Sequence, residues 1–115
     1  MGDRNLQVAA PRKNQLQRIA LTTTGANTAL DARVLGIGWV RVKVVTCNVQ
    51  LYFTDASGDA VVLDAATGDT CGYPLLAGQW EDFYLTGKEQ FVAWDADGTG
   101  ALYIVRAGVE RTGKR

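Results

Sequence analysis

The chain has 115 residues and a mass of 12.4 kDa, is 47% hydrophobic and 21% charged, and so has the size and composition of one small globular domain. It contains no histidine, which removes the usual general base and the commonest metal ligand and argues against catalytic triads and His-bearing metal sites. No apolar run reaches the roughly 20 residues of a membrane-spanning helix, and the first 18 residues lack a signal-peptide pattern. We therefore expect a soluble, unprocessed protein without enzymatic activity.

The neutral total conceals an uneven distribution of charge. Residues 1–43, 44–105 and 106–115 carry net charges of +5, −8 and +3. Such a division indicates surfaces that attract different neighbours or sister copies, although solvated faces of a twisted sheet would also explain it. We expect neither a nucleic acid nor a membrane as partner. The aromatic residues all lie beyond Gly38, mostly in the acidic block, and so are not clustered with the basic ends of the chain.

The first predicted element is an extended N-terminal arm, residues 1–15, which is polar, basic and without periodicity. Candidate strands follow at 17–23 and 28–35; the second could also form a short helical turn, and we favour extended structure. The clearest strand is 39–47, where Val40, Val42 and Val44 alternate with Arg41 and Lys43. Its valines are expected to face a core and its charges to face solvent.

Further strands are predicted at 49–54, 60–63, 79–85, 90–94 and 101–106, with the last two joined as a hairpin. Seven or eight short strands, separated by turns rich in Gly and Asp, predict an all-β domain over residues 16–107 and a C-terminal tail over 108–115. The expected architecture is an antiparallel β-sandwich, jelly-roll-like, or a small barrel. The predicted core consists of Val40, Val42, Val44, Leu51, Phe53, Val62, Phe83, Leu85, Val92, Leu102 and Ile104.

The cysteines and acidic residues give no sign of a catalytic, cofactor or metal site. Cys47 and Cys71 lack CxxC spacing and are expected to be buried free thiols, with one disulfide as the alternative and a functional thiol as a remote third. The loop at 95–100 begins like a calcium loop, but Arg106 stands where an EF-hand requires Glu. We assign no catalytic, cofactor-binding or metal-binding residue and expect no cofactor.

The aromatic residues allow two interpretations. Three tryptophans and four tyrosines could form a platform for carbohydrate, because flat aromatic faces stack on sugars. We favour the ordinary alternative, in which large aromatics fill the core and the seams between subunits. Tyr52 and Tyr84 alternate with core positions and should point outward, and together with Trp80 they are the predicted oligomer interface.

Several segments carry a resemblance to a known group of proteins. They are RIALTTTG at 18–25, WVRVKVVT at 39–46, YFT at 52–54, LLAGQWEDFYL at 75–85, FVAW at 91–94 and GALYIVR at 100–106. This pattern, which extends over roughly residues 16–108, resembles small β-sandwich virion proteins of tailed bacteriophages, including head decoration (cement) proteins. The resemblance implies a structural protein that binds the outer capsid shell as an oligomer and stabilises the seams between capsomers.

The same resemblance implies the major capsid protein as partner, a homotrimer or homodimer, and a location on the virion surface after assembly in the host cytoplasm. The basic termini are expected to dock on the shell or on neighbouring subunits. The docking residues would be Arg4, Arg12, Lys13, Arg18, Arg111, Lys114 and Arg115. Two alternatives stay open: a tail, head-fibre or connector component of the virion, and a carbohydrate-binding β-sandwich module.

Overall fold

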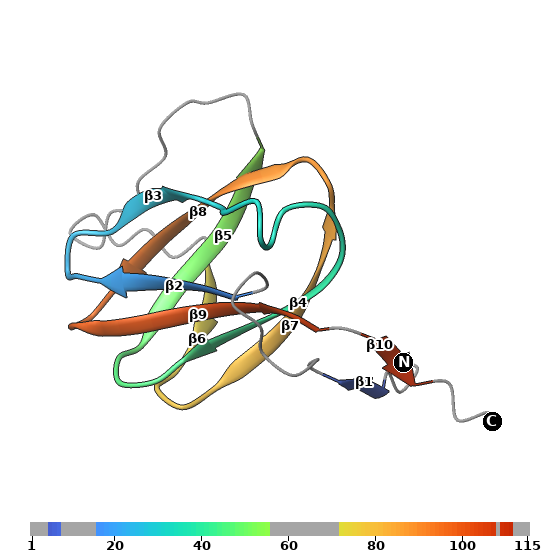
Figure 1. The fold of residues 1–115 in the computed structure, drawn as a ribbon. Coiled ribbons are helices and arrows are strands. Elements are labelled where there is room, and N and C mark those ends of the chain that lie inside the picture. The colour runs from blue at the N-terminus through green and yellow to red at the C-terminus, as the bar shows by residue number, and fades with distance from the viewer. Residues whose placement is uncertain (1–4, 8–15, 56–71, 108, 112–115) are drawn as a thin grey trace.

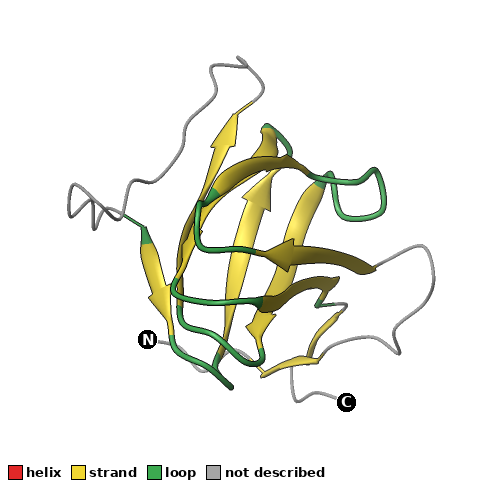
Figure 2. Cartoon of the chain, turned by 90° about the vertical axis from the view of Figure 1, so that its left-hand side faces the viewer, coloured by secondary structure: helices red, strands yellow, loops and turns green. Residues whose placement is uncertain are grey.

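The computed structural model describes residues 5–7, 16–55, 72–107 and 109–111, and these residues form strands and loops only (Figures 1 and 2). None of these segments is a helix that could cross a membrane. The strands are β1 (Asn5–Gln7), β2 (Leu16–Leu21), β3 (Ala26–Ala29), β4 (Ile37–Val44), β5 (Val49–Asp55), β6 (Tyr73–Leu75), β7 (Trp80–Thr86), β8 (Glu89–Ala96), β9 (Gly100–Arg106) and β10 (Val109–Arg111).

Eight of these strands form two four-stranded antiparallel sheets. One sheet has the order β2-β9-β4-β7 and the other β3-β8-β5-β6 (Figure 1). Consecutive strands alternate between the sheets, except that β5 and β6 share one. This is the eight-stranded jelly-roll arrangement. The prediction of an all-β antiparallel sandwich is confirmed.

The remaining two strands pair with each other, apart from both sheets. Antiparallel β1 and β10 bring Leu6 opposite Glu110 (Figure 1). One of these strands comes from the predicted N-terminal arm and the other from the predicted C-terminal tail. The described parts of the two terminal segments are therefore joined by backbone pairing.

The core lies between the two sheets and follows from alternation along each strand. In β4, Val40, Val42 and Val44 are fully buried, whereas Lys43 between them is exposed. Eight of the predicted core residues are buried: Val40, Val42, Val44, Leu51, Leu85, Val92, Leu102 and Ile104. Phe53 and Phe83 are partly buried and pack edge to face, with ring centroids 5.4 Å apart. Val62 and the predicted strand 60–63 lie outside the described residues.

Two predictions of local structure are wrong. Strands β8 and β9 do not form a hairpin, because β8 lies between β3 and β5 while β9 lies between β2 and β4 of the other sheet. Residues 97–99 thus cross from one sheet to the other. Extended structure over 28–35 ends at Ala29, because the Asp31 carbonyl accepts hydrogen bonds from the Val34 and Leu35 amides and closes a turn.

Polar side chains tie the turn after β3 to the β2-β9-β4-β7 sheet. Buried Gln17 of β2 donates from Nε2 to the Ala29 carbonyl and accepts from the Asp31 amide, both at 2.9 Å. Arg106 of β9 donates to the carbonyls of Val34 and Ile37 at 3.1 and 2.8 Å. A side chain at Gly38 (φ +139°) would place its Cβ 2.6 Å from this guanidinium, so the approach requires glycine.

Glu89 organises the turn between β7 and β8. Its carboxylate accepts hydrogen bonds from the Thr86 amide and hydroxyl and from the Gly87 amide, at 2.9 to 3.2 Å. Burial disfavours the charged form, but these donors outweigh burial and lower the pKa of Glu89. The ionised carboxylate therefore stabilises the turn.

We predict that Glu89→Gln lowers the free energy of unfolding at pH 7 by about 1 kcal/mol, because the charge that strengthens these hydrogen bonds is lost. In the native protein this contribution is complete above the ordinary pKa of 4.5 and disappears as the pH falls through the lower folded-state value. Urea unfolding at several pH values measures it. The neighbouring variant Lys88→Gln serves as control, and equal stability of Glu89→Gln and native protein at pH 7 would contradict the assignment.

Candidate functional site: an aromatic and basic sheet face

The outer face of the β2-β9-β4-β7 sheet gathers aromatic and basic side chains from all four strands. Strand register places Arg18, Tyr103, Lys43 and Trp80 in one row across the sheet. A second row contains Leu16, Val105, Arg41 and Asp82, and a third places Trp39 opposite Tyr84. We call the set Arg18, Trp39, Arg41, Lys43, Trp80, Asp82, Tyr84 and Tyr103 the aromatic-basic face.

The centre of this face is an ion pair that also stacks on an aromatic ring. Arg41 donates from Nε and Nη2 to the two carboxylate oxygens of Asp82, at 2.7 and 3.0 Å. The hydrogen bond to Asp82 raises the pKa of Arg41 despite partial burial. The Arg41 guanidinium carbon also lies 3.8 Å from the centroid of the Trp80 ring. The pair therefore fixes both the guanidinium and the indole.

The other side-chain hydrogen bonds on this face are longer, and two of its aromatic side chains are exposed. Trp39 and Tyr84 pack edge to face with centroids 5.3 Å apart. Arg18 donates to the Tyr103 hydroxyl at 3.4 Å, and Lys43 donates to the Gly78 carbonyl at 3.3 Å. Trp80 and Tyr84 are 49% and 51% exposed, unusual values for such large side chains.

This composition suits the binding of another protein. Trp, Tyr and Arg are the residues that most often dominate the energy of protein interfaces. Among the described residues of this face, Arg18, Arg41 and Lys43 stand against one carboxylate, that of Asp82, so these residues together carry a net positive charge. An acidic partner surface would complement it.

The structure brings together only some of the predicted site residues. Arg18, Trp80 and Tyr84 share the aromatic-basic face, whereas Tyr52 is half-buried on the outer side of the opposite sheet. Arg111 belongs to β10, and its side chain is not described. The other predicted docking residues, Arg4, Arg12, Lys13, Lys114 and Arg115, lie outside the described residues.

The separation of basic and aromatic residues along the sequence does not persist in the fold. Basic and aromatic side chains lie side by side, because β2 and β4 from the basic block are in one sheet with β7 and β9. The alternation of Trp39, Arg41 and Lys43 with buried valines did indicate an outward face. Its neighbours from β7 and β9 could be found only once the strand order was known.

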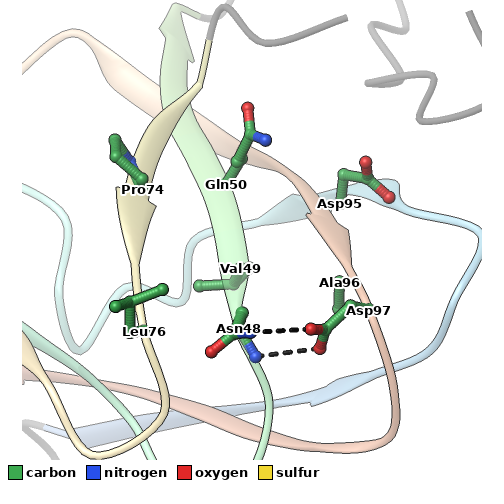
Figure 3. Close-up of a pocket in the computed structure, with 8 residues that line it drawn as sticks. All are labelled: Asn48, Val49, Gln50, Pro74, Leu76, Asp95, Ala96 and Asp97. Atoms are coloured by element: carbon green, nitrogen blue, oxygen red, sulfur yellow. Dashed lines mark hydrogen bonds between the residues drawn. The ribbon is translucent and has the colours of Figure 1, made fainter. Parts of the chain in front are cut away.

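A second candidate, a hollow of about 320 Å³, lies beside β5, β6 and the end of β8 (Figure 3). It is lined by Asn48, Val49, Gln50, Pro74, Leu76, Asp95, Ala96 and Asp97. Asp97 accepts hydrogen bonds from the Asn48 amide and Nδ2 at 2.9 and 2.8 Å, and Asn48 Oδ1 accepts one from the Ala77 amide at 2.9 Å. Asn48 thus joins three loops, which makes this hollow a structural junction.

Cys47 lies next to this junction. It is a buried free thiol, as predicted, and burial together with the nearby Asp97 raises its pKa. Both effects keep the sulfur protonated, which disfavours nucleophilic chemistry. Cys71 lies outside the described residues.

Comparisons with protein-family models, with curated proteins and with solved structures found no match. Two features of this chain therefore define its class: a jelly-roll β-sandwich and, on one of its sheets, an exposed face rich in Trp, Tyr and Arg.

We predict a measurable coupling between Arg41 and Asp82, whose side chains are only 21% and 8% exposed. Arg41→Ala, Asp82→Ala and the double variant form a thermodynamic cycle, and urea unfolding followed by circular dichroism gives each free energy. The expected coupling is about 1 kcal/mol, the upper end for ion pairs near a surface. A coupling of zero within error would show that this pair does not hold the face in place.

Proposed function

We propose that this protein is a non-enzymatic virion structural protein of a tailed bacteriophage, a capsid decoration protein that stabilises the shell. It binds the outer surface of the major capsid protein through the aromatic-basic face. The observation that carries the proposal is the exposure of Trp80 and Tyr84 beside Arg41 and Lys43 on one sheet. The sequence resemblance to small virion β-sandwich proteins is the reason for proposing a phage capsid as the binding partner.

The jelly-roll fold agrees with a role as a capsid decoration protein, but other functions also use this fold. Jelly rolls occur in viral capsid domains, but also in lectins and other proteins, so the choice depends on the face itself. A cement protein needs exposed anchors that bury on contact, and Trp80 and Tyr84 provide them. Many copies on one shell would add their individually modest contacts through multivalency.

The charge of the face indicates how attachment would work. Its excess of basic side chains favours an acidic patch on the shell. We therefore expect attachment to weaken between about 50 mM and about 500 mM salt, because salt screens exposed charges. Cosedimentation of the protein with particles at both salt concentrations measures this, and unchanged binding would rule out electrostatic docking.

A tail, head-fibre or connector role would use the same face at a different position on the particle. Immunogold electron microscopy of particles from the genome that encodes this chain distinguishes these roles. Labelling across the whole head supports decoration. Labelling at one vertex or on the tail identifies the other virion roles, and unlabelled particles contradict a virion role altogether.

Carbohydrate binding is the alternative from another class of function, since the aromatic-basic face contains four aromatic rings. The guanidinium of Arg41 over the Trp80 ring occupies one side of the indole on which a sugar would stack. We therefore favour a protein partner. Selective binding on a glycan array, lost in Trp80→Ala, would reverse this preference.

We predict that Trp80→Ala weakens attachment to particles at least 10-fold, about the loss expected for a hot-spot tryptophan. The matched control is Leu76→Ala, which removes another exposed apolar side chain (54% exposed) away from the aromatic-basic face. Titration of particles with labelled protein gives both affinities. Equal weakening by the two variants would show that the aromatic-basic face is not the attachment surface.

A further inference from the structure

The β7 strand forms one edge of the β2-β9-β4-β7 sheet, and among the described strands only β4 pairs with it. It is the longest of the four sheet edges. The β6 edge has three residues and contains Pro74, the β3 edge has four residues, and the β2 edge has six and carries Arg18. Short length, proline and charged side chains all protect edges from pairing. Strand β7 has seven residues and no proline, and of its two charged residues, Glu81 and Asp82, the second is paired with Arg41 of β4.

Exposed apolar side chains concentrate around the same edge. The large apolar residues that are exposed in the described part of the chain all belong to β4, β6, β7 or the turns next to them: Ile37, Val45, Tyr73, Leu76, Trp80 and Tyr84. Apolar surface gathered at one edge, instead of being scattered, is typical of a contact surface.

The hydrogen-bond pattern shows which backbone groups of β7 are available. The Val44 amide donates to the Gln79 carbonyl at 3.1 Å, which sets the phase of the β4–β7 ladder. In an antiparallel ladder, alternate residues then bond to β4, and the amides and carbonyls of Trp80, Asp82 and Tyr84 point to the open edge. The Thr86 amide also points to this edge, where it donates a hydrogen bond to the Glu89 carboxylate.

We propose that β7 pairs antiparallel with β7 of a second copy of this chain, in a register centred on Phe83. This register sets all seven residues opposite one another, with Trp80 opposite the partner's Thr86, which contributes only its carbonyl because its amide donates to Glu89. It also sets Asp82 opposite the partner's Tyr84, and Glu81 opposite the partner's Leu85. Sliding the centre by one residue, to Asp82, would place two aspartates opposite each other, which is unfavourable.

In this register no two carboxylates of β7 stand directly opposite each other, so a second copy can be its partner. A two-fold axis perpendicular to the sheet satisfies the pairing and gives a closed dimer. The two aromatic-basic faces then lie on the same side of one continuous eight-stranded sheet. This dimer goes beyond the proposed function, since it forms in solution without any shell.

Two substitutions at one position test the pairing. Tyr84→Glu places a carboxylate opposite Asp82 of the second copy and is expected to give a monomer. Tyr84→Lys places an ammonium there and is expected to keep the dimer, although both variants lose the contact with Trp39. Light scattering after size exclusion measures the mass, expected to be twice 12.4 kDa for the native protein. Circular dichroism confirms that each variant is folded.

A native monomer or trimer would overturn the proposal, as would a dimeric Tyr84→Glu or a folded, monomeric Tyr84→Lys. If either variant fails to fold, hydrogen exchange of the native protein decides instead. The amides of Asp82 and Tyr84 should exchange more slowly as protein concentration rises, while those of the β3 edge should not change. Concentration-independent exchange at Asp82 and Tyr84 would overturn the pairing, and neither result depends on shell binding.

Discussion

The packing of two apolar sheet faces against each other is the interaction on which the rest of this structure depends. Val42, Leu51 and Leu102 lose all contact with solvent between the sheets, and burial of such side chains is the main favourable term in folding. Successive side chains of a strand point to opposite faces of the sheet, so the residues between these core positions must point away from the core. Once the valines of β4 face inward, Arg41 and Lys43 must face outward, so the core determines which side chains form the exposed surface.

The jelly-roll order determines which of these outward side chains meet. Arg18 and Tyr103 are 85 residues apart in sequence and hydrogen-bonded in space, because β2 and β9 are neighbours. Almost every connection crosses between the sheets, so few strand pairs are local. The aromatic-basic face is therefore a product of long-range topology, with contributions from four separate parts of the chain.

This explains what could be predicted from the sequence. The alternation at Val40, Val42 and Val44 is a local signal, and it correctly indicated a strand, its buried side and the all-β class. The turn at 97–99 looked like a hairpin loop, because Asp and Gly serve equally well in a turn that crosses between sheets. Strand order is not encoded locally, so Trp80 and Tyr84 could be predicted as exposed but not as neighbours of Arg41 and Lys43.

The pairing of β1 with β10 has a consequence for the ends of the chain. Asn5–Gln7 and Val109–Arg111 pair with each other through their backbones, although more than 100 residues separate them. The two ends are thus one structural unit and not two independent extensions. Shortening the chain at either end leaves the opposite strand without its partner, so the effects of deletions at the two termini cannot be assigned separately to each terminus.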